Sequence, residues 1–151
     1  LLATGFGSGY ARVAPGTFGS VLGIPLAWAC QFDNCHQLTT VVIGLLLFAV
    51  GVPICNAGAR LLHSKDPKQV VFDEIAAFAW VFLFVPLNPT TAIAGFLLFR
   101  FFDVLKPWPI SKFDELKGGF GIMIDDTVAG LIAGGILGGL WHLFSSNIYV
   151  T

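Results

Sequence analysis

Long apolar runs, separated by short polar segments, are the feature that most constrains how this chain can fold. Five runs stand out, at residues 17–32, 38–59, 70–87, 90–105 and 122–144. A helix needs about 20 apolar residues to cross a bilayer, so residues 38–59 form the clearest span and residues 17–32 a short one. The chain is 11% charged, whereas soluble domains carry roughly 25% charged residues. The sequence therefore predicts a single all-α domain over residues 1–151, a polytopic membrane helix bundle with about five membrane-embedded helices.

Proline and glycine signals divide the runs. Asn88-Pro89 predicts a tight turn after the third run, and Pro107-Trp108-Pro109 ends the fourth. Residues 110–117 are typical of a short interfacial segment. The glycines of residues 118–121 predict a turn immediately before the fifth run.

The basic residues all fall on one side of the predicted membrane. If the runs alternate in direction, the N-terminal segment, residues 60–69 and residues 100–126 share a side. All eight Lys and Arg lie in these segments, and the loop on the opposite side carries Asp33. The positive-inside rule then places the charged side, with its polar site, in the cytoplasm.

Three of the runs bring carboxylates to one membrane depth. Asp73 and Glu74 open the third run, Asp103 closes the fourth, and Asp125 and Asp126 open the fifth. Carboxylates at this depth are costly to desolvate, and a divalent cation is the simplest means of keeping several of them ionised. Carboxylate oxygens suit Mg²⁺ or Mn²⁺. Ion pairs that merely anchor the helix ends are the alternative interpretation.

Two glycine-rich segments near the N-terminus, residues 4–10 and 14–20, complete the pattern. Glycines allow backbone N–H groups to approach an anion closely, although a flexible juxtamembrane arm is the alternative. Carboxylates with a divalent cation, beside Lys and Arg, suit a phosphate group, because cations neutralise its oxygens while the metal activates water. The residues thus predict a metal-dependent enzyme acting on a phosphorylated lipid.

Four motif blocks follow one another along the chain: G-S-G at 7–9 with A-P-G-T-F-G-S at 14–20, D-E at 73–74, F-R-F-F-D-V-L-K-P-W-P-I at 99–110, and G-G-F-G-I-M-I-D-D-T-V-A-G at 118–130. In this order they resemble the bacterial phosphatidylglycerophosphatase A family over nearly the whole chain. The resemblance implies Mg²⁺-dependent hydrolysis of the terminal phosphate of phosphatidylglycerophosphate to phosphatidylglycerol and inorganic phosphate. It also implies a multi-pass protein of the bacterial inner membrane whose active site faces the cytoplasm. Two positions depart from the family pattern: Asp66-Pro67-Lys68 stands where Asp-His-Gly is frequent, and Ala76 where Gly is usual.

The resemblance carries roles onto particular residues. The catalytic candidates are Asp73, Glu74, Asp125 and Asp126, and the candidate Mg²⁺ ligands are Asp73, Glu74, Asp103, Asp125 and Asp126. The candidate phosphate-binding residues are Arg12, Ser8, Thr17, Lys65, Arg100 and Lys106, of which Ser8 and Thr17 belong to the glycine-rich loops. The expected partner is a phospholipid substrate in the membrane, and no nucleic-acid partner is expected. The sequence leaves open whether water attacks directly or an aspartyl-phosphate forms first.

Two other classes of protein are weighed against the enzyme. A small ion-coupled transporter would place acids near mid-span and show a repeat between its halves, and neither is visible. A non-catalytic membrane subunit would use small-residue faces, such as residues 134–139, against a partner. Those glycines are expected instead to pack within the bundle or to support a homo-oligomer.

Overall fold

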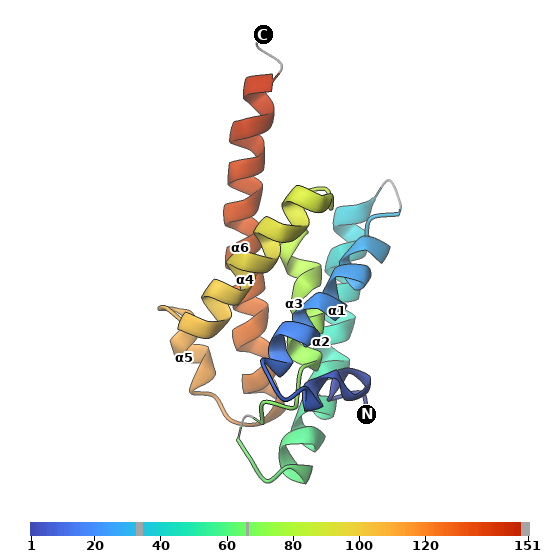
Figure 1. Ribbon diagram of the computed structural model, residues 1–151, viewed down its shortest axis with the longest axis vertical. Coiled ribbons are helices and arrows are strands. Elements are labelled where there is room, and N and C mark those ends of the chain that lie inside the picture. Colours follow the sequence, from blue (N-terminus) through green and yellow to red (C-terminus); the bar gives the residue numbers. More distant parts are fainter. Residues whose placement is uncertain (33–34, 66, 149–151) are drawn as a thin grey trace.

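A bundle of helices forms the whole of the described chain, as the computed structural model shows for residues 1–32, 35–65 and 67–148 (Figure 1). Asp33 and Asp66 lie outside these residues. No strand occurs in the described residues, so the prediction of an all-α fold is confirmed. The elements are η1 (Gly5–Tyr10), α1 (Pro15–Ala29), α2 (His36–Leu61), α3 (Phe72–Val81), α4 (Pro89–Leu105), α5 (Ile110–Asp114) and α6 (Gly118–Ile148).

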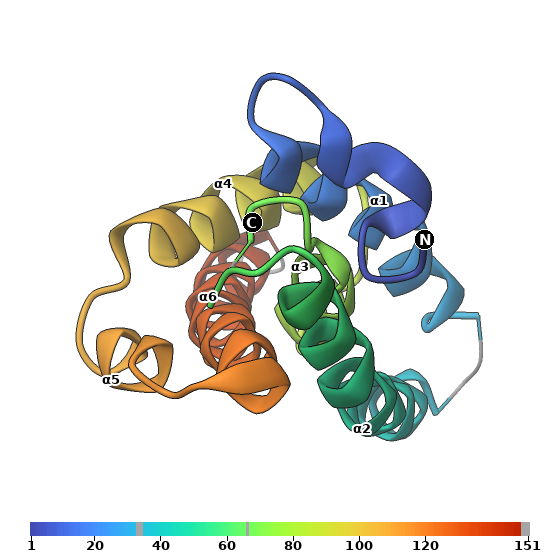
Figure 2. The same cartoon turned by 90° about the horizontal axis from the view of Figure 1, so that it is seen from below.

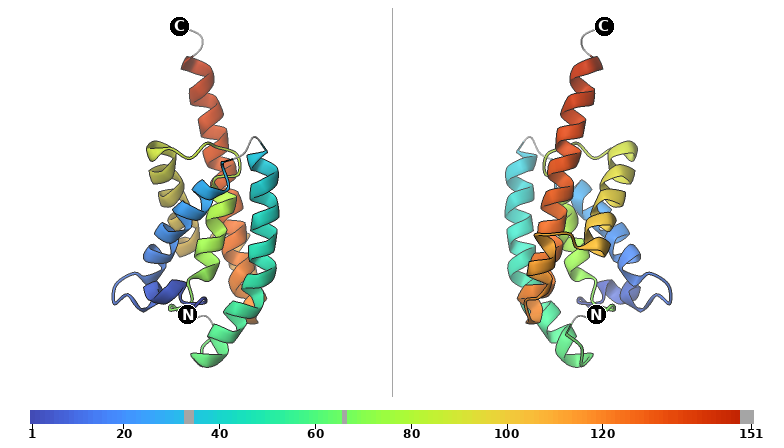
Figure 3. Two further views of the ribbon diagram at one scale, coloured as in Figure 1. Left: turned by 90° about the vertical axis from the view of Figure 1, so that its right-hand side faces the viewer. Right: turned by 90° about the vertical axis from the view of Figure 1, so that its left-hand side faces the viewer.

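Two of the described helices are long and apolar enough to cross a membrane. They are α2, with 26 residues, and the 28 residues Gly118–Ser145 of α6. At 1.5 Å per residue both exceed the ~30 Å of the hydrocarbon core, and α6 extends well beyond its neighbours (Figure 3). The other helices are shorter, with 15 residues in α1, 17 in α4 and 10 in α3. Two candidate spanning helices are consistent with the predicted membrane bundle, and the number of about five membrane-embedded helices stays a prediction.

The third apolar run forms a short central helix instead of a span. Helix α3 ends at Val81 and packs against α1, α2 and α6 (Figure 2), and its residues from Ala76 to Val81 are all buried. After the helix, Gln31, which lies just beyond α1, holds the connection: its amide donates to the carbonyls of Phe82 and Val85 and accepts from the Leu87 N–H. The apolar character of this run thus reflects burial within the protein.

Of the glycines predicted to form a turn before the fifth run, Gly118 has left-handed backbone geometry, with φ of 77°, and those after it are helical. Helix α6 begins at Gly118 and continues without a break. Gly119, which has no side chain, lets the first turn of α6 pack directly on α2. A Cβ added at Gly119 would lie 1.9 Å from the Val52 carbonyl oxygen. Asp125 and Asp126 are consequently in the third turn of α6 rather than at its start.

Further along α6, glycines pack against the backbone of α3. A Cβ at Gly130 would lie 2.7 Å from the Ala77 carbonyl oxygen, and one at Gly134 would lie 2.5 Å from that of Trp80. Close approach of two helices through small residues is a common packing mode in membrane bundles. The expectation that residues of this stripe pack within the bundle is therefore met at Gly134, and homo-oligomerisation stays a prediction.

The boundaries of α4 follow the sequence signals. Asn88 caps its N-terminus by accepting hydrogen bonds from the backbone N–H groups of Thr90 and Thr91. The helix ends at Leu105, before Lys106 in left-handed backbone geometry and the predicted proline stop. The short α5 then begins at Ile110, within the predicted interfacial segment.

Candidate active site

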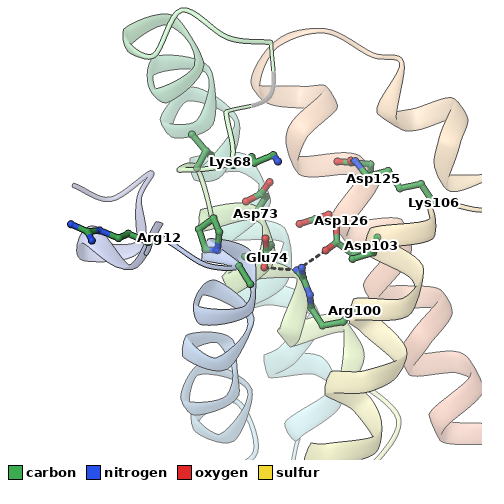
Figure 4. Close-up of a pocket in the computed structure, with 14 residues that line it drawn as sticks. Arg12, Lys68, Asp73, Glu74, Arg100, Asp103, Lys106, Asp125 and Asp126 are labelled. Carbon is green, nitrogen blue, oxygen red and sulfur yellow. Dashed lines mark hydrogen bonds and ion pairs between the residues drawn. The ribbon is translucent and has the colours of Figure 1, made fainter. Parts of the chain in front are cut away.

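A cavity of about 630 Å³ opens at the end of the bundle where α1, α3 and α6 begin and α4 ends (Figure 4). Carboxylates and cations gather on its wall. The acidic lining residues are Asp73, Glu74, Asp103, Asp125 and Asp126, and the basic ones are Arg12, Lys68, Arg100 and Lys106. All five acids named as candidate metal ligands are thus brought together from three helices.

The three aspartates of α3 and α6 are almost fully removed from solvent. Asp73 is 8% exposed, Asp125 5% and Asp126 4%. Asp73 and Asp126 face each other across the cavity, with Asp103 beside them (Figure 4). Neighbouring residues on a helix point about 100° apart, so Asp126 turns toward α3 and α4 whereas Asp125 turns toward Lys106.

Arg100 holds two of the carboxylates. Its Nη1 lies 3.0 Å from Glu74 Oε2 and 2.6 Å from Asp103 Oδ2, in a shielded site where the Arg100 side chain is only 21% exposed. Ser20 of α1 donates a hydrogen bond of 2.7 Å to the same Glu74 oxygen. Gly16 leaves room for this group, because a Cβ there would lie 2.1 Å from Glu74 Oε1. The ion pair between Glu74 of α3 and Arg100 of α4 therefore depends on the close packing of α1 at Gly16.

Lys106, just after α4, links Asp125 of α6 to Asp114 of α5. Its Nζ lies 2.7 Å from Asp125 Oδ2 and 2.5 Å from Asp114 Oδ1. Partial burial disfavours the charged amine, but the hydrogen bonds to Asp114 and Asp125 outweigh it and raise the pKa of Lys106 above its ordinary value. The hydrogen bond from Lys106 in turn lowers the pKa of Asp114. Both groups are therefore charged at neutral pH, and α5 is fastened to the site.

The candidate phosphate-binding residues separate into two groups. Arg100 and Lys106 lie in the cavity wall, and Arg12 lines the cavity with its guanidinium turned away from the carboxylates (Figure 4). Ser8, Thr17 and Lys65 are absent from its lining. Ser8 instead donates to the Thr4 carbonyl and Lys65 to that of Asp114. Their proposed contact with phosphate has no support from this geometry.

Sequence reasoning missed three polar residues of the site. Lys68 lines the cavity and extends toward Asp73 (Figure 4). Ser20 reaches Glu74, and Asp114 reaches Lys106. Lys68 stands at one of the positions that depart from the family pattern, which was the available signal. Ser20 and Asp114 gave no signal, because their roles depend on helix–helix packing.

The carboxylates of the cavity are the side chains that could hold a divalent cation. Among the described residues, no three His, Cys, Asp or Glu side chains stand ready around a single point. The ion pairs explain this, since Arg100 draws Glu74 and Asp103 to itself and Lys106 draws Asp125. The wall combines five carboxyl groups with four basic side chains. Hard oxygen donors in this cavity fit Mg²⁺.

The comparisons with known proteins agree on one family. The chain matches the phosphatidylglycerophosphatase A family over residues 1–141. It is 41% identical to the phosphatidylglycerophosphatase A of Escherichia coli (strain K12), over 94% of this chain and 83% of that protein. It is 40% identical to the protein of the same name from Haemophilus influenzae, over 88% and 82% of the two chains.

A third relative carries a different name. The chain is 38% identical to a Bacteroides thetaiotaomicron protein named as a candidate phosphatidylinositol-3-phosphatase, over 87% of this chain and 86% of that one. No solved structure matches the chain significantly. The chain therefore belongs to the phosphatidylglycerophosphatase A family of phosphatases.

Proposed function

We propose that this protein is a Mg²⁺-dependent phosphatase that removes the terminal phosphate of phosphatidylglycerophosphate at the cytoplasmic face of the bacterial inner membrane. The observation that carries the proposal is the convergence of five carboxylates and four cations on one cavity. The names of the Escherichia coli and Haemophilus influenzae relatives supply the substrate. A volume of about 630 Å³ is in the range of small-ligand sites.

Five carboxylates are available to hold the cation, and Asp73 and Asp126 are the foremost because they face each other across the cavity (Figure 4). Asp103, Asp125 and Glu74 are the further candidates, each already within reach of a cation of the protein. Mg²⁺, when bound, would neutralise phosphate oxygens and acidify water. Deep burial of Asp73 and Asp126 keeps competing water away from them.

The basic residues would position the phosphate. Arg100 and Lys106 lie beside the carboxylates, so their charges can compensate oxygens that become more negative in the transition state. Lys68 and Arg12 add positive charge to the same wall. In the reaction a water oxygen bonds to phosphorus and a carboxylate takes its proton. The ester P–O bond to glycerol breaks, and the leaving oxygen takes up a proton.

The position of the cavity suits a lipid substrate. It lies at the end of the bundle where α2 finishes and α6 starts (Figure 1). Because these two helices are the candidate spans, this end would stand at headgroup depth. The shorter α1, α3 and α4 would be embedded beside them, with the basic segments in the cytoplasm.

Phosphate release from phosphatidylglycerophosphate in detergent micelles tests the proposal, with Mg²⁺ and with EDTA. We expect activity with Mg²⁺, none with EDTA, and a loss of at least about 100-fold in Asp126→Asn. Glu115→Gln is the matched control, because Glu115 is an exposed acid outside the cavity.

Three outcomes would contradict parts of the proposal. Robust activity in EDTA would contradict the dependence on a metal. A loss in Glu115→Gln equal to that in Asp126→Asn would contradict the assignment of the cavity as the active site. No activity from folded native protein would favour a transporter or a non-catalytic subunit. Phosphatidylinositol 3-phosphate belongs in the same assay as a competing substrate, because of the name of the third relative. If phosphatidylinositol 3-phosphate is hydrolysed faster than phosphatidylglycerophosphate, it is the better substrate and the proposed substrate is wrong.

A further inference from the structure

A basic hollow lies at the same end of the bundle, outside the active-site cavity. It has a volume of about 580 Å³ and is formed by the last turn of α2, the loop after it and the start of α6. We call it the basic groove. Four of its lining residues are basic or can become so: Arg60, His63, Lys65 and Lys117. All four are exposed.

The basic groove is separate from the active site in this structure. A small space between them has a volume of about 10 Å³ and is lined in part by Lys65, Asp114 and Asp125. That volume is at the lower limit for a single water molecule. A ligand in the basic groove would therefore not reach the catalytic carboxylates, and the groove is a site of its own.

Basic side chains dominate the charge of the described groove lining, while the Lys65 amine also interacts electrostatically with the Asp114 carboxylate outside it. The described lining contains no carboxylate, and Arg60, His63, Lys65 and Lys117 form no ion pair with a carboxylate of the described chain. Lys65 donates to the backbone carbonyl of Asp114 at 2.9 Å, which holds its amine near the groove. The remaining polar lining, Asn56 and Ser64, can donate hydrogen bonds as well.

The turn after α2 fixes the groove in shape. His63 has left-handed backbone geometry, with φ of 50°, which is uncommon for a residue other than glycine. Its N–H donates to the Arg60 carbonyl, and the N–H of Ser64 donates to that of Ala59. These two hydrogen bonds form a Schellman motif, which commonly ends a helix. It brings residues on both sides of the turn, including Arg60 and His63, to the same hollow.

We propose that the basic groove binds the phosphate group of an anionic phospholipid that is not the substrate. The groove lies between the ends of α2 and α6, the two helices able to cross a membrane, so a headgroup there would leave its acyl chains along their apolar surfaces. Basic pockets between membrane helices on the cytoplasmic side suit anionic headgroups. The inference rests on the membrane placement in the proposed function and is independent of its catalytic step.

Lipid binding by the full chain in neutral detergent tests the proposal. Native mass spectrometry would follow titrations with phosphatidylserine, an anionic probe, and with phosphatidylcholine, a zwitterionic one. We expect preferential binding of phosphatidylserine and a loss of about five-fold in Lys117→Gln and in Arg60→Gln, the effect of one surface charge. Lys112→Gln is the matched control, because Lys112 is an exposed lysine on α5 outside the groove.

The same titration separates this proposal from the proposed function. Asp126→Asn should bind phosphatidylserine as the native protein does, whatever its activity. Displacement of the lipid by excess inorganic phosphate would identify free phosphate as the ligand of the groove, and failure to displace it would identify the headgroup. Equal binding of the two lipids, or native binding by Lys117→Gln and Arg60→Gln, would overturn the proposal.

Discussion

Gly16→Ala is the sharpest probe of the candidate active site, because it adds one methyl group beside the ion pairs of Arg100 with Glu74 and Asp103. The new Cβ would lie 2.1 Å from Glu74 Oε1 and 3.0 Å from Arg100 Nη1. Glu74 must then move by roughly 1 Å to restore van der Waals separation. The clashing atom is the tip of a flexible side chain, so the carboxylate rather than the helix backbone should give way.

The cost to stability can be worked out from the contacts. Displacing Glu74 weakens its hydrogen bonds with Ser20 and Arg100, each contributing about 1 kcal/mol. Alanine is favoured over glycine in a helix by up to about 1 kcal/mol, which offsets part of this loss. The free energy of unfolding should therefore fall by only about 1 kcal/mol. Activity should fall far more, because a 1 Å misplacement at a reacting centre can cost ~100-fold.

Two measurements check this prediction: phosphate release with Mg²⁺, and thermal unfolding in the same detergent. Gly135→Ala is the control, since a Cβ at Gly135 meets no atom within 4 Å, and it should retain activity and stability. A folded Gly16→Ala with activity within about two-fold of native would refute the reasoning. It would mean that the position of the Glu74 carboxylate does not matter for the reaction.

Three further predictions concern the frame around the site. Gln31→Ala removes three hydrogen bonds to the α3–α4 connection and should lower the free energy of unfolding by about 2–4 kcal/mol in detergent denaturation; an unchanged unfolding midpoint would contradict this role. Asn88→Ala should cost about 1 kcal/mol through loss of the α4 cap, seen as a lower unfolding temperature. Lys106 lowers the pKa of Asp114, so the ion pair stabilises the protein at pH values above the ordinary pKa of an aspartate, ~3.9. This contribution is lost as the pH falls through the lower pKa of Asp114 in the folded protein. The stability difference between native protein and Asp114→Asn, at most about 1 kcal/mol for so exposed a pair, should therefore shrink below about pH 4; a difference that grows in acid would show that the pair has another role.

Much of the candidate site could be predicted because its signals are local in the sequence. A carboxylate next to an apolar run must lie near the end of the resulting helix, whatever the packing of the other helices. That placed Asp73, Asp103 and Asp126 at one depth, and the structure brings them to one cavity. The turn at Asn88 and the stop before Pro107 were predictable for the same reason, since each acts on the backbone within a few residues of itself.

The sequence by itself thus determined that the chain is helical, where most helices begin or end, and which acids share one end of the bundle. Only the tertiary structure decided that residues 72–81 form a short central helix, that Lys68 lines the active site, and that Lys65 belongs to the basic groove. The physical reason is that these outcomes depend on helix rotation and tilt, which the packing of all the helices sets together. Apolar residues buried by protein and by lipid look alike in a sequence, so α3 could be separated from a span only by its neighbours.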